Sequence, residues 1–265
     1  MRLSLTRRNA ALVKGALGIA LFLAAWQASV PLVGLEPYYY PSPRDVLAAL
    51  GELIRSGIFP VYLFDSIGRY AAGVSIGVVL GIATGLLIGL SSLASRILWP
   101  TINFLFAIVE VAWIPIFVIW WGYGFKTILI GLCYVVFFPV LYNILLGVRT
   151  VPQVYLNAVR SLGATRWQIL RDVILPAVTP NIVTGFRVGA GFAFRGLVFA
   201  EMIAASTGIG YLIFEGAANN QTARTIVGMF VMGLLWLGLD NFYLKPFERL
   251  TIERWGMVTT AGARE

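Results

Sequence analysis

Histidine is absent from this 265-residue sequence, and cysteine occurs once, at Cys133 inside an apolar run. One cysteine cannot form an internal disulfide, and without histidine the chain has neither histidine metal ligands nor histidine general bases. A metal site would have to use carboxylates or carbonyl oxygens. Because few combinations of catalytic groups remain, we expect no catalytic residue, no metal site and no enzymatic activity on this chain.

Charged residues are also scarce. They make up 12% of the chain, against 59% hydrophobic residues, and the mean hydropathy is +0.84. Soluble proteins contain about a quarter charged residues, and the few charges here could not cover the surface of a soluble domain of this length. The composition therefore favours a polytopic membrane protein over a soluble domain.

The net charge of +8 raises the question of nucleic-acid binding. The basic residues, however, lie between apolar runs and are not interleaved with aromatic residues as they are on a nucleic-acid surface. We therefore expect membrane lipid, and no nucleic acid, around this chain.

Uncharged stretches of about 20 residues are long enough to cross the hydrocarbon of a bilayer. They predict six transmembrane helices, at about 15–33, 70–90, 97–122, 127–148, 182–205 and 225–244. A cleaved signal peptide is the alternative for the first stretch, but this stretch is long for a signal and no small-x-small site ends it. The predicted fold is an all-α membrane helix bundle, with residues 1–265 forming one domain.

The segment between the first two predicted spans is more polar. Tyr38, Tyr39 and Tyr40 are typical interfacial anchors, and Leu47, Leu50 and Ile54 recur at helical spacing. We expect a short amphipathic helix at about 43–56, lying at the outer interface of the membrane.

The basic residues predict the orientation of the bundle. Cytoplasmic segments of membrane proteins carry an excess of lysine and arginine. With the N-terminus inside, the predicted cytosolic pieces hold thirteen basic residues, including Arg249, Arg254 and Arg264, and the outer pieces hold Arg44, Arg55, Arg69, Lys126 and Arg224. Both termini are therefore expected in the cytoplasm.

Glycines recur every fourth residue in the second predicted span. Residues four apart share one face of a helix, and a stripe of glycines lets another backbone approach closely. We expect a tight helix contact, within the chain or across a dimer, at Gly73, Gly77, Gly81, Gly85 and Gly89.

The longest predicted cytosolic segment, the coupling loop of residues 149–181, has a helical pattern. Glycine at position 163 separates two short amphipathic helices and suits a left-handed helix end. The helically spaced apolar residues are Tyr155, Val159 and Leu162 before it and Trp167, Leu170 and Ile174 after it.

Residues 155–164, YLNAVRSLGA, followed by Leu175-Pro176, resemble the EAA loop of binding-protein-dependent ABC importer permeases. Asn157 replaces the family's usual glutamate, and Val159 replaces its second alanine. The resemblance implies that this loop inserts into a groove of a separate ATPase. The residues expected to couple to that ATPase are Asn157, Ala158, Arg160, Leu162, Gly163, Ala164, Leu175 and Pro176.

Similarity to the branch that moves taurine, aliphatic sulfonates and nitrate extends over nearly the whole chain. The segments that carry it are 40–43, 112–122, 138–139, 200–205 and 208–210. It implies a type I ABC importer permease in the bacterial cytoplasmic (inner) membrane, acting as a homodimer with an extracytoplasmic binding protein. It also implies that ATP and magnesium bind to the partner ATPase, and that the solute is a small anion such as a sulfonate, nitrate or an organic acid.

The sequence has no Gly-x-x-x-x-Gly-Lys-Ser/Thr loop, which agrees with an ATPase on another polypeptide. An ion-coupled secondary transporter is the alternative function, but such transporters usually contain repeated halves, and none is visible here.

Ionisable residues inside predicted spans mark candidate positions on the translocation path. Each costs about 3 kcal/mol or more at a helix centre unless it is paired or faces water. Glu110 and Arg195 depart from the related branch, and we expect them to pair across the path. Glu201 is expected either to fix helix contacts or to line a gate, Arg187 can snorkel to the cytosolic interface, and Trp113 completes the candidate set.

Overall fold

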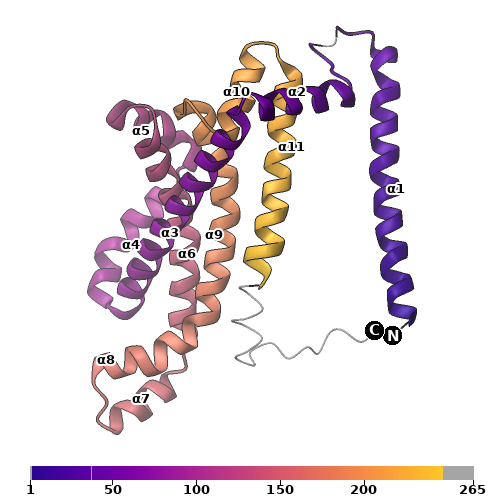
Figure 1. Ribbon diagram of the computed structural model, residues 1–265. Coiled ribbons are helices and arrows are strands. Elements are labelled where there is room, and N and C mark those ends of the chain that lie inside the picture. Colours follow the sequence, from indigo (N-terminus) through magenta and orange to yellow (C-terminus); the bar gives the residue numbers. More distant parts are fainter. Residues whose placement is uncertain (1, 37, 247–265) are drawn as a thin grey trace.

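The computed structural model describes residues 2–36 and 38–246, and within them it contains helices and no strands. The predicted Arg249, Arg254 and Arg264 of the C-terminal tail lie outside these residues. Figure 1 shows long helices side by side, two short helices at one end and a cap of shorter helices at the opposite end. The elements are α1 (Arg2–Val33), α2 (Pro43–Arg55), α3 (Ile58–Leu90), α4 (Ser92–Phe106), η1 (Glu110–Trp113), α5 (Ile114–Trp121), α6 (Phe125–Thr150), α7 (Gln153–Ser161), α8 (Arg166–Gln168), η2 (Ile169–Ile174), α9 (Leu175–Ala204), α10 (Ile209–Ala218), α11 (Thr222–Leu239) and η3 (Asp240–Leu244).

The glycine stripe of α3 packs inside the chain, against α6. A Cβ atom added at Gly77 would lie 2.7 Å from Val136 Cβ, and one at Gly81 would lie 2.8 Å from Val140 Cβ. The α6 residues facing the stripe also recur every fourth position, so the two helices meet along matching rows. These rows are Gly73, Gly77, Gly81, Gly85 and Gly89 against Leu132, Val136, Val140, Ile144 and Val148.

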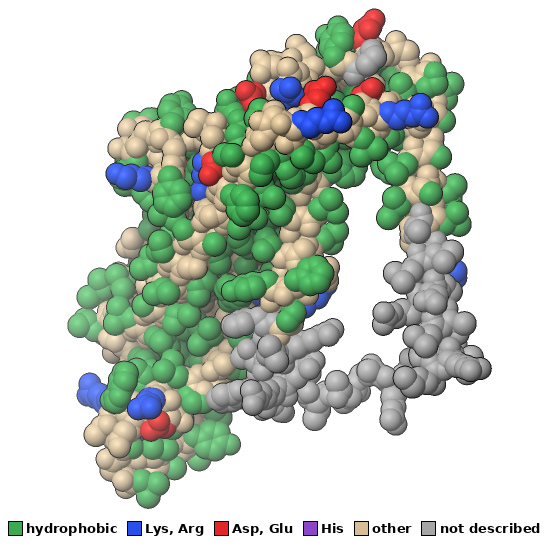
Figure 2. Space-filling model, in the orientation of Figure 1, with side chains coloured by type: hydrophobic (Ala, Val, Ile, Leu, Met, Phe, Trp, Pro, Cys, Tyr) green, Lys and Arg blue, Asp and Glu red, His purple; other side chains and the backbone are tan. Residues whose placement is uncertain are grey.

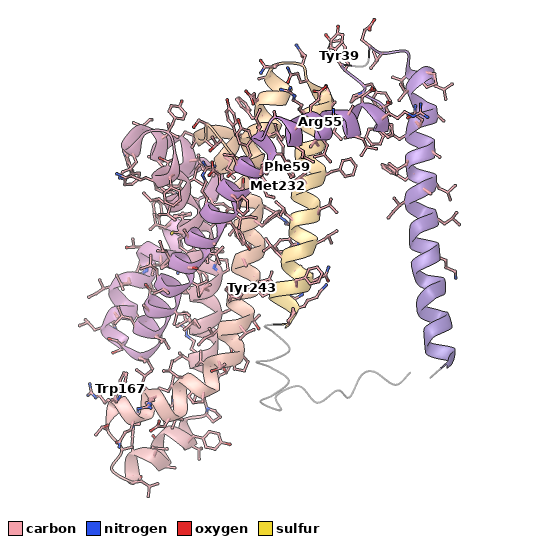
Figure 3. All side chains as sticks on the ribbon, viewed as in Figure 1. Tyr39, Arg55, Phe59, Trp167, Met232 and Tyr243 are labelled. Carbon is pink, nitrogen blue, oxygen red and sulfur yellow. The ribbon has the colours of Figure 1, made fainter. Side chains whose placement is uncertain are left out.

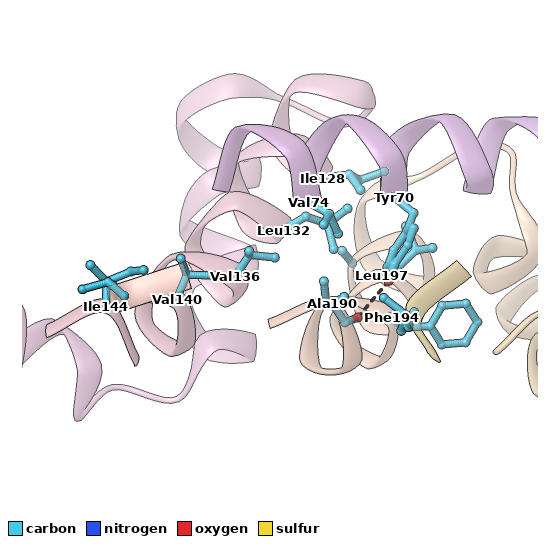
Figure 4. Close-up of a cluster of buried hydrophobic side chains, with 14 of the residues drawn as sticks. Tyr70, Val74, Ile128, Leu132, Val136, Val140, Ile144, Ala190, Phe194 and Leu197 are labelled. Carbon is cyan, nitrogen blue, oxygen red and sulfur yellow. Dashed lines mark hydrogen bonds between the residues drawn. The ribbon is translucent and has the colours of Figure 1, made fainter. Parts of the chain in front are cut away.

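Helix α6 is the centre of the bundle because its other side packs against α9. A Cβ atom added at Gly185 of α9 would lie 3.2 Å from the Cα atom of Val140, and Gly189 faces Val136. Figure 4 shows the resulting buried cluster between the helices, where Tyr70 donates a 3.0 Å hydrogen bond to the carbonyl of Ala190. This packing of three helices fixes the position of α9, which carries most of the candidate site.

The third predicted span, 97–122, is not one straight helix. Helix α4 ends at Phe106, and the η1–α5 segment that follows is bent by 92° from it. Residues 107–109 between the two segments are not helical, and Pro115 lies beyond the bend, at the start of α5, where a proline is tolerated. Glu110 therefore lies at the bend and not in the middle of a straight span.

Other boundaries also differ from the predictions. Helix α3 begins at Ile58, so Arg69 lies within a helix and is buried, instead of belonging to an outer loop. The fifth predicted span, 182–205, lies within one longer helical segment that runs from Arg166 to Ala204. In the described residues, four helices are long and apolar enough to cross a membrane, or five if the bent pair counts as one, and α1 adds the apolar stretch Leu17–Val33.

The short helix before α3 forms where the sequence predicts it. Ser42 and Asp45 make a capping box at the start of α2. Val46, Ala49 and Leu53 are buried, whereas the predicted Leu47 and Ile54 are exposed. Helix α2 therefore lies across α11 at the capped end of the bundle (Figure 1).

The surface follows the pattern expected of a membrane protein. On the face shown in Figure 2, charged side chains gather toward the two ends, and most of the surface between them is hydrophobic. Because a bilayer core is about 30 Å thick, the 30 residues of α9, at about 1.5 Å each, are sufficient to cross it.

Candidate functional site

The coupling loop contains the two short helices that the sequence predicts. Helix α7 ends at Ser161, and Gly163 adopts a φ of 81°, in the left-handed region that favours glycine. Thr165 and Gln168 then form a capping box that starts α8. Figure 1 shows α7 and α8 projecting from the end of the bundle opposite α10.

Large apolar side chains are exposed on this loop. Leu162 is 86% exposed, and Trp167, labelled in Figure 3, is 65% exposed. Buried Leu156, Ile169 and Ile174 hold the loop against the bundle, so the exposed side chains are carried on a packed support. Of the remaining predicted coupling residues, Asn157, Ala158, Arg160 and Gly163 are exposed, and Ala164, Leu175 and Pro176 are partly buried.

A π-helical turn, η2, joins the coupling loop to α9. The N–H of Leu175 bonds to the carbonyl of Leu170, five residues earlier. Pro176 lacks an N–H and its ring crowds the carbonyl four residues before it, and a wider turn relieves this crowding. Leu175-Pro176 therefore marks a change of helical pitch and not the end of the loop.

Glu110 lines an apolar cavity of about 500 Å³ beside the bend between α4 and α5. Aromatic side chains of α4, α6 and α9 surround it, namely Phe106, Tyr134, Phe138, Tyr142 and Phe192. Trp113 packs on Phe117 and Tyr134, with ring centroids 5.8 and 5.7 Å apart, and is not among the residues that line the cavity.

Arg195 lines a second cavity, of about 440 Å³, between α9 and α11. Val188 and Phe192 line both cavities, so the two hollows flank one stripe of α9. Arg195 is exposed on that stripe, and the expected pairing of Glu110 with Arg195 is not formed within the described part of the chain.

Arg187 lines the same second cavity and is tied to α11. Its Nη2 lies 3.6 Å from Asp240 Oδ1, and Lys245 Nζ lies 2.8 Å from Asp240 Oδ2. Arg187 therefore takes part in an ion-pair group between α9 and η3, and it lies in the interior of α9 rather than near a helix end.

Glu201 belongs to a polar group that we call the corner cluster: buried Ser66, Arg69 and Glu201 with partly buried Asp65 and Thr207. Glu201 is 0% exposed, and its Oε1 accepts a 2.8 Å hydrogen bond from Arg69 Nη1. Ser66 Oγ donates to both Glu201 oxygens, at 2.9 and 2.8 Å. Glu201 thus makes helix contacts, one of its two expected roles, and it is not among the residues that line the two cavities, while a gate at Glu201 stays a prediction.

The corner cluster also binds the turn between α9 and α10. Arg69 Nη1 donates to the carbonyl of Thr207 at 2.6 Å, and Arg69 Nη2 donates to the Thr207 hydroxyl at 2.8 Å. That hydroxyl donates to Asp65 at 2.6 Å. Gly208, with φ of 114°, allows the turn to approach Glu201 closely, since a Cβ there would lie 2.5 Å from Glu201 Oε1.

Sequence reasoning missed Arg69, Ser66 and Thr207 as members of this group. Arg69 follows Asp65 by four residues near the edge of an apolar run, which resembles the flank of a span. A helix starting at Ile58 would have placed both in a span, where a charge needs a partner. Glu201 was the available partner.

Removing Glu201 should destabilise the fold strongly. In Glu201→Ala, Arg69 keeps its charge in a buried position, and breaking one partner of a buried pair costs about 3–5 kcal/mol. Thermal unfolding in detergent should show a clear fall in Tm. As a matched control, Asp65→Asn should change Tm little, because Asp65 is 41% exposed and lies 3.8 Å from Arg69. Equal effects of both substitutions would contradict this assignment.

The fold defines the class of protein first. It is similar to that of the MetNI methionine ABC transporter in an inward-facing form, with a TM-score of 0.59 at 18% identity, over 72% of this chain and 94% of that one. This likeness shows that the chain shares the helical fold of that transporter's chain.

The chain belongs to the family of binding-protein-dependent transport system inner membrane components, whose family model matches residues 77–243. It is 32% identical to the taurine transport system permease TauC of Escherichia coli, over 88% of this chain and 86% of that protein. It is 30% identical to the nitrate import permease NrtB of Synechocystis, over 87% and 86%. The chain is a multi-pass membrane permease subunit, and these likenesses favour that function over an ion-coupled transporter.

Proposed function

We propose that this chain forms the translocation path of an ABC importer for a small anionic solute and couples to a separate ATPase through α7 and α8. The observation that carries the coupling role is that large apolar side chains, Leu162 and Trp167 among them, are exposed on a loop that buried Leu156, Ile169 and Ile174 hold against the bundle. Exposed apolar groups on a rigid support are typical of a protein-docking surface.

The orientation of the chain follows from this role. If α7 and α8 meet the ATPase, they lie in the cytoplasm, as do the N-terminus and the tail, and α2 and α10 lie at the outer face. An extracytoplasmic binding protein then delivers the solute to that face. The ATPase partner supplies the ATP and magnesium site, and two copies of this permease form a homodimer around the path.

The α9 stripe of Val188, Phe192 and Arg195 is the proposed wall of the path. A guanidinium exposed along a span is expensive in lipid, so Arg195 requires water, a solute or a partner carboxylate. The two cavities beside the stripe contain Glu110 on one side and Arg195 on the other. The relatives described above are named for taurine and nitrate, which carry negatively charged oxygens. In this proposal, the positively charged side chain of Arg195 therefore binds the anionic group of the solute.

Arg195→Leu should lower uptake of the anionic solute about 10- to 100-fold, because a hydrogen bond to a charged group contributes about 1.5–3 kcal/mol. Arg195→Lys should retain part of the uptake, since it keeps the charge and loses the two-pronged geometry. Uptake of labelled taurine, nitrate and bicarbonate into proteoliposomes containing the whole importer measures this. Unchanged uptake in Arg195→Leu would remove Arg195 from the path. Retention of the ATPase by both variants is the control for assembly.

A further inference from the structure

The corner cluster lies at the far end of the helix that leaves the coupling loop. The segment from Arg166 to Ala204 is one helical stretch of 39 residues through α8, η2 and α9. It begins three residues after Gly163, at the proposed ATPase contact, and it contains Glu201 in its last turn. This helical stretch, in which Pro176 and Pro180 donate no hydrogen bond, joins α8 to the turn that precedes α10.

That turn is held on two sides by buried groups. Glu201 of α9 accepts a 2.9 Å hydrogen bond from the N–H of Gly210, and Ser66 of α3 accepts one of 2.9 Å from the N–H of Ile209. Arg69 of α3 binds both the carbonyl and the hydroxyl of Thr207. The backbone between α9 and α10 is thus fixed to α3 through side chains that are almost fully buried.

The contacts of Arg69 to Thr207 are not needed to neutralise the charge of Glu201. A lysine at position 69 could supply the charge, and well-packed apolar residues can replace a buried ion pair without loss of stability. The arginine instead uses both Nη atoms on Thr207, and Thr207 in turn bonds Asp65. These contacts orient the turn relative to α3, a task separate from compensating a charge.

We infer that Arg69 and Thr207 are positioning residues for transport. They make α3, the end of α9 and the turn of residues 205–208 move as one unit, so that the ATP-driven displacement of α7 and α8 reaches the opposite face. This inference rests on the proposed function, because it takes the ATPase contact at α7 and α8 as given. The inference does not require the turn of residues 205–208 to move relative to α3.

The test measures how accessible position 206 is, because Ser206 is exposed in this turn. The chain with Cys133→Ala and Ser206→Cys is assembled with its ATPase in lipid nanodiscs, and the rate of labelling by a maleimide is measured with and without ATP and vanadate. Trapping should change the rate about fivefold, at the low end of typical coupling between sites. In Arg69→Lys and in Thr207→Val the change should fall below about 1.5-fold, while ATPase retention and basal hydrolysis stay as in the parent.

Thr179→Val is the matched control, because among the described residues the Thr179 hydroxyl bonds only the Leu175 carbonyl of its own helix. It should respond as the parent does. A full nucleotide response in Arg69→Lys and Thr207→Val would overturn the inference, as would a parent that hydrolyses ATP without any change at Ser206→Cys. Loss of ATPase retention in both variants would also count against it, since the cluster would then serve folding alone. A parent that binds no ATPase would instead contradict the proposed function.

Discussion

Leu162→Asp is expected to abolish retention of the ATPase and, with it, transport. The side chain is 86% exposed at the tip of the α7–α8 loop, and an apolar anchor of an interface contributes about 2 kcal/mol or more, which is about 30-fold in affinity. Aspartate would also place a charge in a groove built for an apolar group. The measurement is the amount of ATPase that co-purifies with the tagged permease in mild detergent.

Leu47→Asp is the matched control for this substitution. Leu47 is 68% exposed on α2, at the opposite end of the molecule from α7 and α8. It makes the same chemical change away from the proposed contact, so ATPase retention should be unaffected. If Leu162→Asp kept its ATPase, or if both variants lost it equally, the docking surface would have to be placed elsewhere.

Gly81→Leu should prevent the bundle from packing. A Cβ at this position would lie 2.8 Å from Val140 Cβ and 2.9 Å from the carbonyl oxygen of Phe137, and the backbone atom cannot move aside alone. Overpacking a well-filled core typically costs about 1–3 kcal/mol, and here the whole side chain must enter the contact between α3 and α6. Size-exclusion chromatography and thermal unfolding in detergent should show aggregated or strongly destabilised protein.

Gly68→Leu on the same helix is the control, because nothing lies within 4 Å of a Cβ added there. It should fold as the wild type does, and it gains helix propensity by about 1 kcal/mol. A stable Gly81→Leu variant would mean that the α3–α6 contact is looser than the structure indicates.

Much of the fold was predictable because helical membrane proteins display their spans as apolar runs. The glycine stripe of α3 was visible at its spacing of four, but the sequence left open whether its partner lay within this chain or across a dimer. The two helices of the coupling loop were predicted from Gly163 and the apolar spacing. The sequence could not show that Leu162 is exposed and Leu156 is buried, because burial depends on the tertiary contacts of the loop.

The errors in the prediction have physical causes. A run of apolar residues from 97 to 122 cannot show whether the chain turns within it, and the bend of 92° became apparent only in three dimensions. The partner of Glu201 is 132 residues away in sequence, so the pair with Arg69 could not be read from local spacing. Glu110 and Arg195 were predicted to pair because both are ionisable residues inside predicted spans, but the structure places them in different cavities.

Affinity purification of the tagged chain from native membranes tests the central claim most directly. The account predicts that an ATPase subunit co-purifies, and that solute uptake by the reconstituted complex stops when ATP is depleted even though ion gradients are maintained. Purification without any ATPase, together with uptake that continues on an ion gradient after ATP depletion, would contradict it.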